Sequence, residues 1–181
     1  QFFADWFSSP LYHARWGGQS ANPALLPGQS VNLQVAYVNT GTATWTPSTV
    51  HLQTSHGQDH VMPFIREDRI NHNPSGWASP SRMLLQESSV APGAVGHFSF
   101  WISVPSGLSP GTYREYVQLV ADGVTSFADL GVNWEITVQS LADTYHARWG
   151  GQSGNPALLP GQSANLTVGF LNTGSSTWSR S

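Results

Sequence analysis

The chain of 181 residues contains no cysteine and no lysine, and only 9% of its residues are charged. Without cysteine, disulfide bonds and thiolate metal sites are excluded. All seven basic residues are arginine, the net charge is −3, and no basic run is present. Nucleic acid is therefore not an expected partner. No run of about 20 apolar residues occurs, so the sequence also predicts no insertion into a membrane.

The residues that are abundant are mostly uncharged. Serine, threonine, asparagine, glutamine and glycine recur throughout the chain, and aromatic residues reach 12%, with eight tryptophans. This composition is more typical of a secreted or surface β-protein than of a cytosolic enzyme. The sequence therefore predicts a protein that is secreted, either extracellular or attached to the cell surface.

One stretch of the chain occurs twice. Residues 12–48 align with 145–181 at a constant offset of 133, and 27 of the 37 aligned positions are identical. A repeat of this length is typical of a domain that begins again, and not of a short solenoid turn. The sequence predicts four parts: an N-terminal segment at 1–11, a domain at 12–139, a linker at 140–144 and the N-terminal part of a second domain of the same type at 145–181.

Alternation of apolar and polar residues predicts strands, because a half-buried strand is apolar on one face only. Strands are expected at 31–38, 96–104, 112–121 and 132–138, with weaker candidates at 12–17, 49–54, 60–65 and 82–86. Pro-Gly pairs precede several of them, and Asp122-Gly123 predicts a hairpin. No helix of useful length is expected. Short strands divided by turns indicate an all-β, immunoglobulin-like antiparallel β-sandwich.

The apolar faces of these strands predict the core. We expect them to meet between two sheets about 10 Å apart. The side chains expected in this interior are Val31, Leu33, Val35, Trp45, Phe98, Phe100, Ile102, Tyr113, Val117, Trp134 and Ile136.

Four short motifs carry a resemblance to a known family. They are Asn39-Thr40-Gly41, Thr44-Trp45, Ala91-Pro92-Gly93 and Pro110-Gly111-Thr112-Tyr113. In this order they resemble the bacterial relatives of the NBR1-type immunoglobulin-like domain, also called the four-tryptophan domain. The resemblance covers residues 12–139 and the front of a second copy at 145–181. It implies an immunoglobulin-like fold, a non-enzymatic role in tethering or recognition, and tryptophans that close the core at Trp45 and Trp178, with Trp16, Trp101 and Trp134 as further members.

The segment 55–81 interrupts the strand pattern with a long polar stretch. It contains three prolines and two of the seven arginines. We expect an ordered loop, because Phe64, Ile65 and Trp77 supply apolar anchors and the prolines reduce the entropy of the free loop. Long loops on a rigid sandwich often carry binding function.

Catalytic and metal-binding patterns are weak in this sequence. His51, His56 and His60, with Asp59, contain ligand types that suit zinc or nickel. Their spacing is loose, however, and positions 51 and 56 would point to opposite faces of a continuing strand, which favours solvated loop histidines over a metal site. The acids form no glycosidase-like motif, and Glu115 is expected to pair with its neighbour Arg114. The sequence predicts no enzyme, no cofactor and no metal site.

Three functional hypotheses remain open from the sequence. The first is a structural protein that associates head to tail with copies of itself through the incomplete repeat. The second is an accessory module that binds carbohydrate or the cell wall, and the third is a hydrolase. Exposed aromatic residues are the expected interaction residues, since tryptophan and tyrosine stack on sugars or bury against proteins: Phe2, Phe3, Trp6, Phe7, Trp77, Trp101, Tyr116, Trp149, Phe170 and Trp178.

Overall fold

The computed structural model describes residues 10–57, 60–65 and 76–179. It divides into two compact units, unit 1 at 1–138 and unit 2 at 139–181. Most of the N-terminal segment at 1–11 and the central part of the loop at 55–81 lie outside the described residues.

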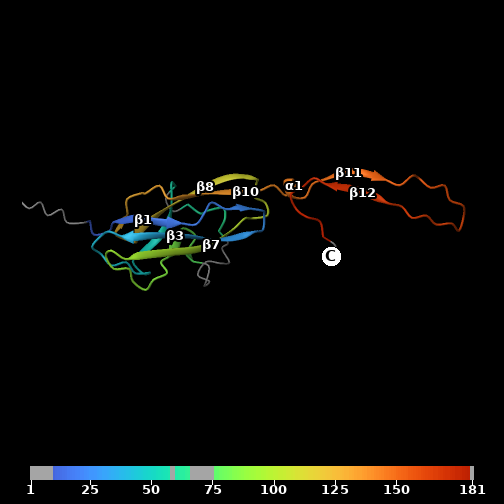
Figure 1. The fold of residues 1–181 in the computed structure, drawn as a ribbon. Coiled ribbons are helices and arrows are strands. Elements are labelled where there is room, and N and C mark those ends of the chain that lie inside the picture. Colours follow the sequence, from blue (N-terminus) through green and yellow to red (C-terminus); the bar gives the residue numbers. More distant parts are fainter. Residues whose placement is uncertain (1–9, 58–59, 66–75, 180–181) are drawn as a thin grey trace, which may run out of the picture. The chain divides into compact units, whose positions relative to one another are not determined.

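Unit 1 contains two sheets that face each other (Figure 1). The three-stranded sheet has the order β1-β3-β7, and all of its pairs are antiparallel. The larger sheet has the order β2-β10-β8-β4-β6-β5, with β9 paired to β8, and there only β2 runs parallel to its neighbour. The strands are β1 (Ala14–Gln19), β2 (Ala24–Leu25), β3 (Ser30–Asn39), β4 (Val50–Ser55), β5 (Trp77–Ser79), β6 (Arg82–Leu84), β7 (Val95–Ser103), β8 (Gly111–Ala121), β9 (Thr125–Ser126) and β10 (Asn133–Val138).

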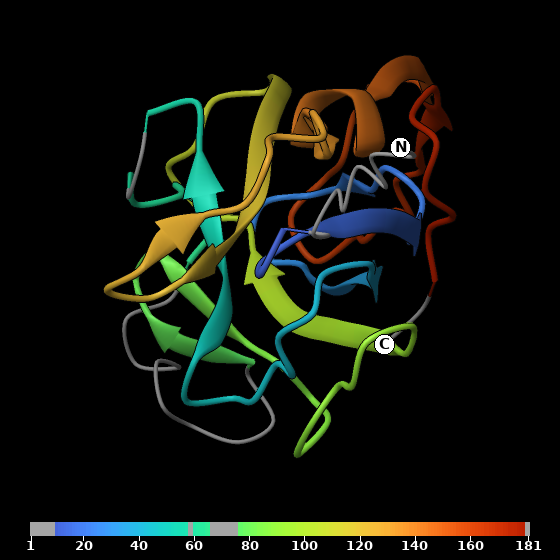
Figure 2. The same cartoon turned by 90° about the vertical axis from the view of Figure 1, so that its left-hand side faces the viewer.

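The all-β antiparallel sandwich expected from the sequence is confirmed. In immunoglobulin-like sandwiches the first, second and fifth strands form one sheet, and the third, sixth and seventh form the other. Here β1, β3 and β7 face β4, β8 and β10 in the same arrangement. The view in Figure 2 shows β4, in teal, beside the gold hairpin of β8 and β9, which the pair Asp122-Gly123 predicts.

A tyrosine corner supports this topology. The Tyr113 hydroxyl, near the start of β8, donates a hydrogen bond of 2.8 Å to the carbonyl of Ser109. In immunoglobulin-like domains a tyrosine at the equivalent corner bonds back to the backbone a few residues upstream. The bond fixes the chain where it crosses from one sheet to the other, so the motif at 110–113 has a defined structural role.

The predicted core is confirmed. Nine of its eleven members are buried, and Val31 and Tyr113 pack against them while partly buried. Aromatic rings contact each other edge to face at the centre: Phe100 lies 5.3 Å from Trp77 and 5.6 Å from Trp134 between ring centroids. Such pairs add to the stabilisation that comes from burial alone.

The turn after β3 is fixed by one buried amide. Asn39 donates to the carbonyls of Ala43 and Val90 at 2.8 and 3.0 Å, and its side-chain oxygen accepts from the amide of Gly41 at 3.1 Å. Trp45 follows and forms a two-way backbone bridge with Val90. The Asn-x-Gly turn and the following tryptophan therefore close this end of the sandwich.

The prediction of a strand at 60–65 is wrong. The described residues there form irregular structure with a turn at 63–64, although Met62 and Phe64 are buried. Proline at position 63 lacks the amide hydrogen of a ladder, and only isolated bonds tie the segment to its neighbours, such as the 2.9 Å bond from the amide of Ser103 to the carbonyl of Phe64. Alternating burial here comes from a loop that packs two side chains into the core.

Unit 2 is a hairpin that follows a single helical turn. The turn, α1 (Leu141–Thr144), falls within the predicted linker and begins at Ser140, whose side chain accepts from the amide of Ala142. The strands β11 (Ala147–Gln152) and β12 (Val168–Asn172) pair as β1 and β3 do in unit 1, and each residue pair lies 133 positions further along the chain. Even the irregularity between Trp16 and Gly18 recurs between Trp149 and Gly151.

Candidate functional site

The outward face of the three-stranded sheet is mostly polar. Directly paired residues in an antiparallel sheet share a face, and the register of β3 with β7 pairs Asn32 with Trp101, Gln34 with Ser99 and Ala36 with His97. We call these six residues the polar face. Their inward neighbours Leu33, Val35, Phe98, Phe100 and Ile102 are buried in the core.

A groove of about 310 Å³ crosses this face. Its lining includes small residues on three adjacent strands, namely Gly18, Ala36 and Ser99. Longer polar side chains border it, among them Gln34, Gln86 and His97. Small side chains on adjacent strands therefore lie among longer polar ones in this groove.

The amides of the polar face are ordered by bonds to each other. The side-chain oxygen of Asn32 accepts from Gln34 at 3.1 Å and from the Ser99 hydroxyl at 2.8 Å. Within the described part of the chain, the Asn32 amide nitrogen and the Gln34 side-chain oxygen have no protein partner. One unused donor and one unused acceptor are therefore held in a fixed arrangement.

An ion pair lies beside the groove. Nδ1 of His97 is 2.5 Å from a carboxylate oxygen of Glu87, and the His97 amide donates to the other oxygen at 2.9 Å. Burial opposes the ionisation of Glu87, but the bonds from His97 outweigh it and hold the pKa of this carboxyl below its usual range. Glu87 is therefore fixed as an anion paired with His97.

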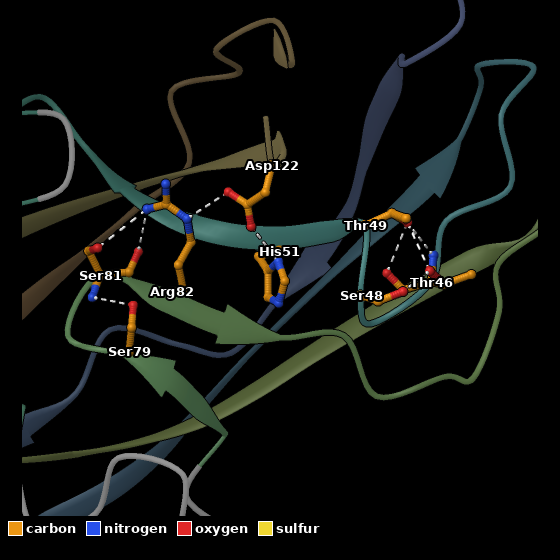
Figure 3. Close-up of polar contacts among 8 residues, drawn as sticks. All are labelled: Thr46, Ser48, Thr49, His51, Ser79, Ser81, Arg82 and Asp122. Atoms are coloured by element: carbon orange, nitrogen blue, oxygen red, sulfur yellow. Dashed lines mark hydrogen bonds and ion pairs between the residues drawn. The ribbon is translucent and has the colours of Figure 1, made fainter. Parts of the chain in front are cut away.

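Three further histidines each contact a separate carboxylate. Figure 3 shows the first: His51 Nδ1 lies 2.7 Å from Asp122, whose other oxygen is 3.1 Å from Nε of Arg82. Arg82 also donates to the carbonyl of Ser81 at 3.2 Å. The Asp122 carboxylate thus connects β4, β6 and the turn after β8, and both of its oxygens are in use.

The other two pairs hold the chain after β4 against β8 and against the segment between β9 and β10. His56 has φ of 60°, an uncommon conformation for a side-chain-bearing residue, and its ring stacks on Tyr116 at 3.7 Å between centroids with 2° between planes. Its Nε2 lies 3.0 Å from Asp129. Nε2 of His60 lies 2.7 Å from Glu115, and Nδ1 of His60 contacts the Gly57 carbonyl at 2.9 Å.

These contacts correct two expectations about individual residues. Glu115 is buried and pairs with His60, while Arg114 pairs with Glu135 across the strands. Neighbouring residues in a strand point to opposite faces, so a pair between 114 and 115 is disfavoured by geometry. The histidines of the loop are not merely solvated, because His51, His56 and His60 each lie beside a carboxylate.

In the described ranges, no three histidines and acids are arranged to hold a metal ion. The carboxylates whose side chains are described, Glu87, Glu115, Asp122, Asp129 and Glu135, each pair with a histidine or arginine. Each pair joins different strands or turns, so the geometry gives them a role in fixing the sandwich.

Unit 2 exposes the side chains that unit 1 buries. Leu33 is 1% exposed and its counterpart Leu166 is 65% exposed, while the values are 2% and 59% for Val35 and Val168. Trp45 and Trp178 differ in the same way, at 0% and 47%. The same residues with the same strand register therefore form a core in one unit and an open apolar face in the other.

Unit 2 has a cavity at the position that corresponds to β10 of unit 1. It measures about 290 Å³ and its lining includes Gln152, Ser153, Asn155 and Pro156. The equivalent residues of unit 1 hold β10: Gln19 donates to the Asn133 carbonyl, the Trp134 indole donates to the Ser20 carbonyl, Asn22 accepts from the Glu135 amide, and Pro23 accepts from the Thr137 amide. The cavity thus corresponds to the place of β10.

The structure separates the expected interaction residues into groups. Trp101, Trp149, Phe170 and Trp178 are exposed, and Tyr116 is half-buried under His56. Trp77 is a correction: it is buried in the core, where its indole donates to the Trp101 carbonyl at 2.7 Å, so it is not an exposed contact residue. Phe2, Phe3, Trp6 and Phe7 lie outside the described residues.

Sequence reasoning missed the polar face as a site. Trp101 was identified by its position out of phase with the core, but Asn32, Gln34 and Ser99 read only as the polar half of an alternating pattern. The register of β3 with β7 is the signal that gathers them, because it pairs each polar residue with another. The depression at Gly18 and Ala36 also requires the third strand.

Comparison with known proteins gives only distant similarities. The sequence matches no protein-family model and no curated protein. Among solved structures, a family 123 glycoside hydrolase from Clostridium perfringens matches with a TM-score of 0.40 and 15% identity over 68% of this chain. A protein of Corynebacterium diphtheriae described as membrane-anchored matches with a TM-score of 0.34 and 13% identity over 72% of this chain. The matches span 23% and 36% of those two chains.

The described residues include no helix of sufficient length and hydrophobicity to cross a bilayer.

Proposed function

We propose that this protein is a non-enzymatic structural protein of the bacterial cell surface or extracellular space, and that it associates head to tail with copies of itself. The observation that supports the proposal is the apolar face of unit 2. Its members are buried at the equivalent positions of unit 1. Full burial of one such side chain contributes about 1.5–3 kcal/mol, so a contact that covers part of this face favours association. The resemblance to NBR1-type immunoglobulin-like domains agrees with a tethering role.

Strand exchange between copies does not cover this face by itself. These 181 residues include two segments of the front type, at 12–48 and 145–181, and one segment, at 49–138, of the type that covers the first in unit 1. If the hairpin of one copy replaced residues 12–48 of another, the displaced segment would expose the same residues. The association proposed here instead uses surfaces that are open while unit 1 stays intact.

Two open strand edges meet this requirement. In unit 1 the strand β3 has β1 on one side and β7 on the other, whereas its counterpart β12 pairs only with β11 within the described residues. In the same residues β1 pairs only with β3, and Trp16 on β1 is 48% exposed. Addition of β12 to β1 of the next copy would pair both edges and bring Phe170 close to Trp16. The two surfaces differ, so the contact repeats from copy to copy.

Sedimentation and light scattering over a range of concentrations test the proposal. The monomer is 19.6 kDa, and we expect the average mass to rise steadily with concentration. Phe170→Asp should weaken association at least tenfold, because a charge would replace an apolar group at the contact. Leu171→Asp is the matched control, since Leu171 is about equally exposed on the other face of β12.

Three results would count against the proposal. A monomeric mass at all concentrations removes self-association. Equal effects of the two substitutions remove the apolar face as its cause. A mass that stops at the dimer replaces the head-to-tail contact with a symmetric one. Deletion of 145–181 should leave a folded monomer, which far-UV circular dichroism and light scattering would show.

A further inference from the structure

The polar face is a second surface: it lies on the outward side of β3 and β7, whereas the proposed association uses the open edges of β1 and β12. It consists of Asn32, Gln34, Ala36, His97, Ser99 and Trp101, with the groove of about 310 Å³ across it. Trp101 is exposed on the same face, two residues along β7 from Ser99, which lines the groove. The chemistry of the groove indicates what it can hold.

The lining of the groove favours a neutral ligand that is rich in hydroxyl groups. Gln34 and Gln86 carry amides, each of which both donates and accepts hydrogen bonds. No lysine or arginine lines the groove, and the His97 ring is paired with Glu87. A phosphate or carboxylate ligand would find no unpaired positive charge there. A sugar hydroxyl, which also donates and accepts, matches amides arranged in this way.

Trp101 adds an apolar platform next to the amides. It stands opposite Asn32 in the register and is 45% exposed. From Trp101 to His97 the strand covers four residues, or about 14 Å, with Ser99 between them on the same face. An aromatic ring packs against the C–H face of a sugar while neighbouring polar groups bond its hydroxyls. An extended chain of sugars can therefore contact the tryptophan and the groove together.

We infer that the polar face binds an extended, neutral β-1,4-linked polysaccharide, with Trp101 as the stacking platform and Asn32, Gln34 and Gln86 as the hydroxyl partners. The flat ribbon of such a chain fits a shallow groove across a sheet better than a compact ligand would. The ordered amides favour binding because little side-chain freedom remains to be lost. This inference does not depend on the self-association proposed above.

The binding test uses the full chain with insoluble cellulose and chitin, at a concentration where sedimentation shows a monomer. We expect at least one of these polysaccharides to retain the protein, and the matching hexasaccharide in solution to compete. Trp101→Ala should lower the association constant at least tenfold, and Gln34→Ala should lower it severalfold. Trp16→Ala is the matched control, since Trp16 is similarly exposed but pairs with the inward-facing Tyr37.

The fold is expected to survive these substitutions. Only the backbone carbonyl of Trp101 accepts the bond from the Trp77 indole, so alanine at 101 retains it. Unchanged thermal unfolding would verify this. No retention on either polysaccharide overturns the inference, as does a Trp101→Ala variant that binds like the original chain. Equal losses from Trp101→Ala and Trp16→Ala would also overturn it, because they would indicate non-specific adsorption through tryptophan.

Discussion

Trp45→Ala is expected to destabilise unit 1 by roughly 3–5 kcal/mol, as is usual for a buried tryptophan reduced to alanine. Trp45 is fully buried, and its ring contacts Phe127 edge to face with 5.5 Å between centroids. Its indole nitrogen has no hydrogen-bond partner among the described residues. The loss would therefore come from packing and from the cavity left behind. It would remove a large part of the 5–15 kcal/mol that stabilises a typical domain.

Urea unfolding followed by circular dichroism measures this loss, and two variants separate its causes. Trp45→Phe keeps much of the volume and removes the unpaired indole N–H, so it should cost clearly less than alanine. Trp178→Ala changes the equivalent position of unit 2, where the ring is exposed, and should leave the main unfolding transition almost unchanged. A Trp45→Ala variant within 1 kcal/mol of the original chain would contradict the role assigned to this residue.

The sequence predicted the fold well where burial alternates along single strands. At 31–38 and 96–104 the period of two identified both the strands and their buried faces, because the side chains of a half-buried strand alternate. The same reasoning failed at 60–65, where Met62 and Phe64 are buried from a loop. Two apolar residues at alternate positions do not by themselves distinguish a strand from a loop that packs into the core, and Pro63 between them was the available warning.

The candidate site was less predictable because it depends on which strands become neighbours. Asn32 and Ser99 are far apart in sequence, and only the register of β3 with β7 brings them together. The partner of Glu115 was missed for the same reason, since His60 reaches it from the chain after β4. Trp77 looked like a loop aromatic, but the pairing of β5 with β6 places it in the core.

Gly76→Ala is the second substitution with a large expected effect. Gly76 has φ of 78°, where a residue with a Cβ is strained by about 1–2 kcal/mol. A Cβ built there would also lie 2.0 Å from the carbonyl oxygen of Ser99 and 2.7 Å from Cα of Phe100. Both are backbone atoms of β7, so the strand itself would have to move. Overpacking of this kind adds roughly 1–3 kcal/mol.

Gly93→Ala provides the control that separates strain from overlap. Gly93 has nearly the same φ, 83°, but a Cβ there meets nothing within 4 Å. We expect Gly93→Ala to cost only the backbone term and Gly76→Ala to cost distinctly more in the same urea measurement. The extra loss should come with a change in the near-ultraviolet signal of the tryptophans, because Phe100 packs between Trp77 and Trp134. Equal losses for the two variants would show that β7 accommodates the methyl group, and that the close approach of Gly76 to this strand does not constrain the core.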